Sequence, residues 1–239
     1  NQEIKGKGIK GAVGTSASFA KLLEGTGMSV QDHERKIMKQ LDLPCVTVAG
    51  QTYPRKFYLL TIMGLACLAQ TLHEFALNGQ ILQSSPFGEV FEPQARSQQS
   101  SSAMPGKRNP RFQELVDSLA ESLPGKMTEA WITAAFVTLE RTLRDSGSKR
   151  STLPESFLCL DEMLLRTGRI INGLEVSKAA IEGNLEHFGP FAALELVLLE
   201  TTKKGANRQE IYQILVDYGK NALEAVRSGL NNPLEELIA

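Results

Sequence analysis

The feature that most constrains the fold is an apolar run that keeps helical periodicity from Phe57 to about Leu82. At 1.5 Å per residue, such a helix would be about 40 Å long, which is longer than a small domain needs. A helix of this length and composition has to bury its apolar surface against other long helices, within one subunit or between subunits. The run therefore predicts a bundle of long helices.

The rest of the chain predicts further helices, several of them begun by a capping residue or ended by glycine or proline. Their expected bounds are 15–23, 29–41, 109–143 with a kink at Pro124-Gly125, 154–174, 179–185, 190–204 and 207–228. No stretch gives a convincing hairpin pattern. The sequence thus predicts an all-α protein with a central helical-bundle domain over residues 1–175 and a smaller C-terminal helical domain over residues 176–239.

Residues 98–110, which read Q-Q-S-S-S-A-M-P-G-K-R-N-P, cannot belong to a core. They end a stretch of about twenty residues with little apolar periodicity, and loops of that length are usually functional or disordered. Composition alone favours a flexible Ser/Gln linker. The last residues are more varied, however, and lead directly into a helical pattern. Hydroxyl groups and Lys107 beside a helix N-terminus are placed to bind or generate an anion.

Composition excludes several classes of protein. The formal net charge of −1 argues against partners such as nucleic acid or a membrane surface. The apolar segment from Phe57 to Ala69 is expected to be too short to span a bilayer. Three isolated cysteines form neither a disulfide framework nor a metal site, which indicates a reducing, cytoplasmic location. The three histidines lack ligand spacing. Because the chain begins without an initiator methionine, we expect it to be a fragment.

Three motifs resemble a known family. S-S-A-M-P-G-K-R-N-P resembles the signature loop G-S-S-x-M-P-x-K-x-N-P of the fumarase/aspartase superfamily. Within that superfamily, G-I-K-G-A-V-G-T-S-A-S-F at residues 8–19 and L-E-R-T-L-R-D-S-G-S-K-R at residues 139–150 are similar to the adenylosuccinate lyases. The resemblance spans nearly the whole chain. It implies the superfamily's long-helix bundle, a homotetramer with active sites shared between subunits, a small-molecule nucleotide substrate, and no cofactor or metal.

The resemblance assigns roles to residues of the signature loop. Ser101 is the general base that removes a proton from the carbon beside a carboxylate, and an alcohol needs cationic support and exclusion of water to do so. Lys107 and Asn109 would meet the oxygens of the dianionic carboxylate that forms. Glu114 matches an acidic position that orients Lys107 or the loop. The substrate-binding residues implied are Ser102, Thr15 and Ser16.

Arg141, Ser146 and Arg150 form a second constellation. On an unbroken helix the two arginines would point in opposite directions, so we expect Gly147 to break the helix and let them converge. Two guanidinium groups and a hydroxyl suit a phosphate. A charged surface helix end with an Arg141–Asp145 pair is the ordinary alternative. The resemblance instead matches these positions to contacts with a nucleotide phosphate.

Four positions depart from the family pattern. Ser16 stands where many members have Gln, Ser100 replaces a Gly, Gly106 replaces an aromatic residue or His, and Leu115 occupies a position where some members have a substrate-binding Arg. These departures leave the exact substrate open, although they do not affect the reaction class.

The expected activity is elimination of fumarate from adenylosuccinate, giving AMP, and from the succinyl-aminoimidazole carboxamide ribotide of purine biosynthesis. One alternative is a superfamily lyase acting on another succinylated substrate. A second is a non-catalytic helical oligomerisation module. Since the family's general-acid histidine lies upstream of the G-I-K-G motif, we expect this chain alone to be inactive or nearly so.

Overall fold

The computed structural model describes residues 4–94, 104, 106–139 and 144–238. The chain divides into two compact units. The first comprises Asn1–Asn78 and Arg111–Asn172, and the second comprises Gly79–Pro110 and Gly173–Ala239. Residues 79–110 thus group with the C-terminal helices in this division, whereas the sequence-based division at residue 175 places them with the bundle. That sequence-based domain boundary stays a prediction.

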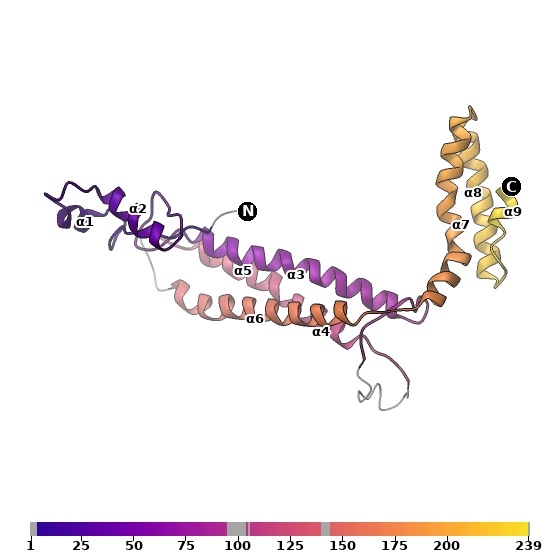
Figure 1. Cartoon of the computed structure of the whole chain (residues 1–239), viewed down its shortest axis with the longest axis horizontal. Coiled ribbons are helices and arrows are strands. Elements are labelled where there is room, and N and C mark those ends of the chain that lie inside the picture. The colour runs from indigo at the N-terminus through magenta and orange to yellow at the C-terminus, as the bar shows by residue number, and fades with distance from the viewer. Residues whose placement is uncertain (1–3, 95–103, 105, 140–143, 239) are drawn as a thin grey trace. The chain divides into compact units, whose positions relative to one another are not determined.

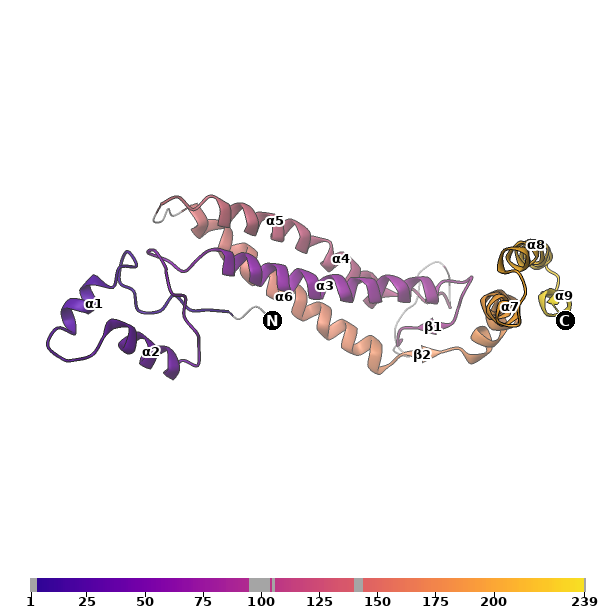
Figure 2. The same ribbon diagram turned by 90° about the horizontal axis from the view of Figure 1, so that it is seen from above.

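The first unit is built on four helices. They are α3 (Lys56–Gln83), α4 (Arg111–Ala120), α5 (Ser122–Ala135) and α6 (Arg144–Asn172). Helices α4 and α5 follow one another end to end alongside α3 and α6 (Figures 1 and 2). Their shared core contains Ala69, Ala76, Val116, Leu123, Leu160 and Met163. The predicted long-helix bundle is therefore confirmed, and α3 begins and ends within one residue of its predicted bounds.

The length of α3 corrects one expectation. Its 28 residues make it, among the described helices, the one that is long and apolar enough to cross a membrane. A mostly buried core helix of a soluble protein can pass the same test of length and composition, and in this helix 22% of the tested window is buried. Here Tyr58, Ile62, Ala69 and Ala76 of α3 are buried against the neighbouring helices of the bundle.

The helix predicted from Asn109 breaks earlier than expected. The interruption lies at Glu121, between α4 and α5, and Pro124 falls in the first turn of α5. A proline in that turn removes an N–H that would have no intrahelical partner, so the helix tolerates it. The expected end at Leu143 is also wrong, because α5 ends at Ala135.

Helix α6 begins ten residues before the predicted start and contains both Gly147 and Pro154. The expectation that Gly147 breaks the helix is wrong. A glycine inside a helix costs only about 1 kcal/mol, and buried packing along the same helix offsets that cost. Thr152 is a buried helical residue rather than a cap, and its carbonyl accepts a 2.6 Å hydrogen bond from Ser156 Oγ.

The second unit contains α7 (Lys178–Lys203), α8 (Arg208–Arg227) and α9 (Leu234–Ile238). Helix α7 runs through Pro190, so the two helices predicted at 179–185 and 190–204 are one. The predicted cap of α8 is confirmed, since Asn207 Oδ1 accepts from Gln209 N at 3.0 Å. Helix α9 was not predicted, and its Leu234 is fully buried.

Two short strands, also unpredicted, complete the second unit. Strand β1 (Val90–Phe91) pairs antiparallel with β2 (Glu175–Val176), and Phe91 lies opposite Glu175. Two-residue strands are too short to give an alternating sequence pattern. The pair joins the polypeptide before the signature loop to the segment that leads into α7.

The N-terminal part of the first unit carries α1 (Ala17–Leu22) and α2 (Val30–Gln40). Ser29 caps α2 as predicted, with Ser29 Oγ accepting from Asp32 N at 3.0 Å. Around these helices the chain forms loops, and one isolated bridge pairs Gly6 with Cys45.

Candidate active site

The glycine-rich N-terminal motif is held in place by a buried ion pair. Lys10 Nζ lies 2.8 Å from both carboxylate oxygens of Glu34, and the two side chains are 7% and 12% exposed. Glu34 also accepts from Ile9 N at 2.8 Å and from Cys45 Sγ at 3.4 Å. Burial raises the pKa of Glu34, but the hydrogen bonds from Lys10, Cys45 and Ile9 outweigh it, so the pKa lies below its usual value.

Two glycines allow this segment to fold so tightly. Gly8 has a φ of +81°, and a Cβ there would lie 2.2 Å from Glu34 Oε1. Gly14 has a φ of +82°, and a Cβ there would lie 1.8 Å from the carbonyl oxygen of Ala49. The glycines of the motif therefore permit close packing that other residues would prevent.

Thr15 and Ser16 lie at the end of this segment, where α1 begins. Ser16 N donates to the Lys10 carbonyl at 2.9 Å, and Ser16 has a left-handed φ of 59°. Its side chain makes no capping hydrogen bond to α1, whereas Thr15 Oγ1 accepts weakly from Ala17 N at 3.4 Å. The two hydroxyls thus stand on a turn whose backbone is tied to the Lys10–Glu34 pair.

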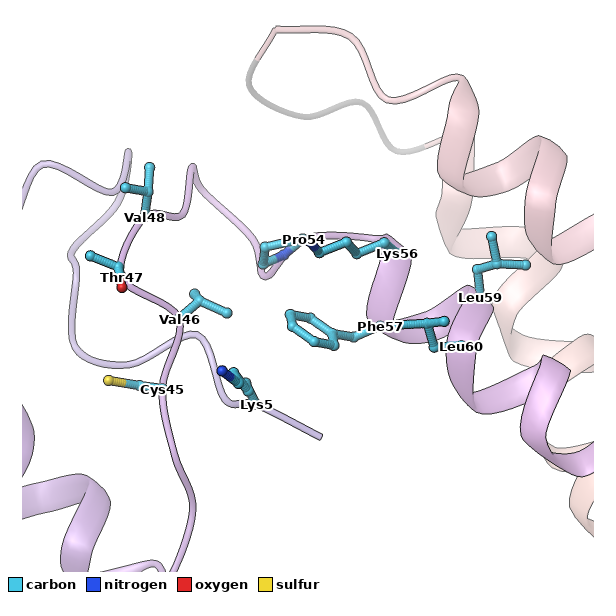
Figure 3. A pocket seen from close by; sticks show the side chains of 10 residues that line it. All are labelled: Lys5, Cys45, Val46, Thr47, Val48, Pro54, Lys56, Phe57, Leu59 and Leu60. Carbon is cyan, nitrogen blue, oxygen red and sulfur yellow. The ribbon is translucent and has the colours of Figure 1, made fainter. Parts of the chain in front are cut away.

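A large open hollow lies between this N-terminal segment and the start of α3 (Figure 3). Apolar side chains such as Val46, Phe57 and Leu60 form much of its wall, with Lys5 and Lys56 beside them. It contains none of the residues that the motifs single out. The shape of this hollow therefore does not identify the site.

Lys107 and Asn109 lie in the second unit, on the stem that connects the signature loop to α4. Lys107 is exposed and Asn109 is half-buried, and Lys107 N donates to the Met104 carbonyl at 3.2 Å. Ser101 and Ser102 lie outside the described residues, so their roles stay predictions. Glu114 is exposed in the first turn of α4, and its proposed orienting role also stays a prediction.

Arg108, between Lys107 and Asn109, anchors the stem, and sequence reasoning did not single it out. Its guanidinium donates to both carboxylate oxygens of Glu175, at 2.7 and 3.0 Å, and to the Glu92 carbonyl at 3.0 Å. The hydrogen bonds between the two side chains raise the pKa of Arg108 and lower that of Glu175. Arg108 stands inside the signature motif, but nothing in the local sequence indicates a partner 67 positions away.

Ser146 and Arg150 lie in the first turns of α6, four residues apart, and therefore on one face of the helix. The helix is unbroken at Gly147, and the predicted convergence of Arg141 with Arg150 stays untested. Ser146 is half-buried and Arg150 is exposed. Among the described residues, neither side chain has a hydrogen-bond or ion-pair partner. Arg141 lies outside the described residues.

Asp145, one member of the alternative Arg141–Asp145 pair, is buried at the start of α6, whereas Arg141 lies outside the described residues, so that pair stays untested. The Asp145 carboxylate lies 2.5 Å from Arg55 and 2.8 Å from Lys149, and the side chains of Arg55 and Asp145 are each 5% exposed. The Arg55 guanidinium also lies 4.8 Å from the centre of the Tyr53 ring. This buried cluster fixes the N-terminal turn of α6, which carries Ser146, against the start of α3.

The described parts of the first unit do not join its two groups of site residues directly. Within them, no hydrogen bond links Thr15 or Ser16 to Ser146 or Arg150. No three His, Cys, Asp or Glu side chains in the described ranges gather closely enough to hold a metal ion. The described residues provide three groups of polar side chains. They are the hydroxyls of Thr15 and Ser16 on a turn, Lys107 on the stem of the signature loop, and Ser146 with Arg150 in the first turns of α6.

Comparison with known proteins supports the motif-based resemblance. Residues 14–125 match the sequence model of a family described as Lyase. The chain is similar to adenylosuccinate lyase from Schistosoma mansoni, with 38% identity over 98% of the chain and 49% of the relative. It is also similar to adenylosuccinate lyase from Saccharomyces cerevisiae, with 36% identity over 97% of the chain and 48% of the relative.

Among solved structures, the chain resembles a fumarate lyase from Mesorhizobium sp. BNC1 with a TM-score of 0.70. The sequence identity is 23%, and the match covers 96% of this chain and 47% of that one. At this identity the likeness concerns the fold, and the expected superfamily fold is confirmed. The chain spans about half the length of the curated relatives it matches.

Proposed function

We propose that this lyase-family chain forms part of an enzyme that eliminates fumarate from adenylosuccinate and from the succinyl-aminoimidazole carboxamide ribotide of purine biosynthesis. The observation that carries the proposal is the position of Ser146 and Arg150, four residues apart, on one face of the first turns of α6. A helix N-terminus with a hydroxyl and a guanidinium suits the phosphate of a nucleotide. The motif that supplies both residues is the one that resembles the adenylosuccinate lyases.

The proposed chemistry is a β-elimination. Ser101 takes the proton from the carbon beside a carboxylate, and the electron pair left on that carbon forms the double bond of fumarate as the carbon–nitrogen bond breaks. Lys107 and Asn109 stabilise the negative charge that builds up on the carboxylate in between. The departing nitrogen needs a proton from a general acid, and the resemblance assigns this role to a histidine upstream of the G-I-K-G motif. Thr15, Ser16, Ser102, Arg141, Ser146 and Arg150 bind the substrate.

The proposal includes a homotetramer with active sites shared between subunits. Its support is the number of large apolar side chains that the first unit leaves exposed. They include Leu68, Phe75, Trp131, Leu158, Leu165 and Ile171, on α3, α5 and α6. Large apolar side chains left exposed on helices in this number are expected at an interface between subunits.

The test uses the protein with the upstream region supplied, incubated with adenylosuccinate while fumarate is followed by ultraviolet absorbance. We expect wild-type protein to release fumarate, and Ser101→Ala to lower kcat at least about a hundredfold with little change in KM. Full activity of Ser101→Ala would remove the assignment of the base.

Two alternatives have their own outcomes in the same assay. Release of fumarate from a different succinylated amine, but not from adenylosuccinate, would favour another superfamily lyase, as the departures at Ser16 and Leu115 allow. No turnover and no phosphate-dependent nucleotide binding would favour a non-catalytic oligomerisation module.

A further inference from the structure

We propose that Arg108 is a positioning residue, which sets the placement of Lys107 and Asn109 by tying the stem of the signature loop to the strand pair β1–β2. This inference rests on the proposed function for its catalytic consequence. The guanidinium of Arg108 is itself engaged by Glu175 of β2 and by the Glu92 carbonyl.

The side chain of Arg108 is held from several directions within the second unit. Its planar fork meets both oxygens of Glu175, which is the geometry that makes an arginine–carboxylate pair directional. The same guanidinium donates to the Glu92 carbonyl, and its centre lies 5.0 Å from the centre of the Phe91 ring. These contacts fix the plane and the position of the guanidinium together.

The backbone of Arg108 is fixed as well. Gln83 Nε2 donates to the Arg108 carbonyl at 3.2 Å, while Gln83 Oε1 accepts from Glu92 N at 2.9 Å. Gln83 is buried, and its hydrogen bond with Glu92 N is shielded from water, while that with the Arg108 carbonyl is partly shielded. Because Lys107 and Asn109 are the residues on either side of Arg108, fixing this residue limits where their side chains can point.

The partner of Arg108 is itself well placed. Glu175 pairs with Phe91 across the strand pair, and Ser177 N donates to the Glu89 carbonyl at 2.8 Å. Asn184 of α7 donates to Glu89 Oε1 at 2.7 Å. The strand pair is therefore tied to the start of α7, and it offers the loop stem a firm point of attachment.

The exposure of the Arg108–Glu175 ion pair indicates how much the pair contributes to stability. Arg108 and Glu175 are 30% and 51% exposed, and an ordinary surface ion pair of this exposure contributes little to stability. The bidentate geometry, the ring contact and the backbone hydrogen bonds restrict the orientation of Arg108 more than they stabilise the fold. Loss of the pair should therefore affect turnover more than folding, which separates a positioning role from a merely structural one.

The experiment is a double-mutant cycle with Arg108→Gln and Glu175→Gln in the protein that includes the upstream region. Each single change should lower kcat about tenfold to a hundredfold, the effect of misplacing a reacting group, with a smaller change in KM and an unchanged melting temperature. The kcat of the double variant should be no lower than that of the poorer single variant, because each substitution removes the same contact between Arg108 and Glu175. Arg108→Lys should recover little, since lysine lacks the planar fork.

Matched controls are Arg169→Gln and Glu182→Gln, which remove the same charges from exposed helical positions. Both should keep wild-type kcat. Additive losses in the cycle, or an equal loss in Glu182→Gln, would overturn the proposal. So would a loss confined to KM, because it would indicate direct contact between Arg108 and the substrate.

A second readout does not depend on turnover. Amide hydrogen exchange in a peptide covering residues 104–110 should be faster in Glu175→Gln than in wild type, and unchanged in Glu182→Gln. If wild-type protein released no fumarate, the proposed function would fail while this exchange would still decide whether the anchor exists. Unchanged exchange in Glu175→Gln would refute the anchoring role of Arg108.

Discussion

At the scale of single residues, Glu34 illustrates how one buried carboxylate can organise a loop. Its carboxylate accepts hydrogen bonds from the Lys10 ammonium, the Ile9 amide and the Cys45 thiol, and it lies where a side chain on Gly8 would otherwise be. Removing one partner of this largely shielded ion pair is destabilising, because the other charge is left without compensation. The turn that carries Thr15 and Ser16 therefore depends on a residue outside the motif itself.

This arrangement predicts a pH dependence. Because the pKa of Glu34 is lower in the folded chain than its usual value, its stabilisation is present at neutral pH and is lost as the pH falls through the folded-state pKa. Denaturant unfolding at a series of pH values should show a decline in the free energy of unfolding toward acid. Glu34→Gln should be less stable at neutral pH and should show a shallower decline, whereas the exposed control Glu24→Gln should follow wild type.

A second prediction at this scale concerns Arg150. If Arg150 binds the nucleotide phosphate, Arg150→Ala should weaken AMP binding by about 1.5 to 3 kcal/mol, the range for losing a hydrogen bond to a charged group. Calorimetric titration of both proteins measures the difference, with Arg169→Ala as a control on the same helix. Equal affinity for AMP in wild type and Arg150→Ala would exclude the phosphate role.

At the scale of elements, α6 runs through a proline in its interior. Pro154 cannot donate to the Arg150 carbonyl four residues before it, and a proline inside a helix costs about 3 kcal/mol relative to alanine. The helix continues because one of its faces is buried, with Thr152, Ser156, Leu160 and Met163 against its neighbours. Tertiary packing here outweighs local propensity.

Pro154→Ala should therefore stabilise the protein. We expect a gain of about 1 to 3 kcal/mol, since the new amide restores a hydrogen bond while alanine gives up some of the unfolded-state restriction that proline provides. Thermal unfolding should shift to higher temperature. A lower melting temperature would instead mean that the proline ring at position 154 is needed for packing in the assembled protein.

At the scale of the whole molecule, the exposed apolar faces of α3, α5 and α6 favour self-association. Leu158, Leu165 and Ile171 are 67%, 58% and 59% exposed, and burying such side chains is worth about 1.5 to 3 kcal/mol each. We predict a homotetramer in solution, and sedimentation velocity at micromolar concentration should detect it. A well-folded monomer under these conditions would contradict the prediction.

Local sequence determined much of this protein. The apolar spacing over residues 57–82 predicts α3 almost to the residue, and Ser29 and Asn207 mark the starts of α2 and α8. The signature loop and its neighbouring motifs predict the family. These features can be read from sequence because periodicity, capping and motif spacing depend on residues within a few positions of one another.

Tertiary structure alone decided the rest. It keeps α6 continuous through Gly147 and Pro154 and α7 continuous through Pro190, where local rules predict breaks. It also brings Glu175 to Arg108 and Asp145 to Arg55, pairs that are far apart in the sequence. The physical reason is the same in each case: burial against distant segments supplies free energy that no local pattern records, and that energy decides whether a helix continues and which charges meet.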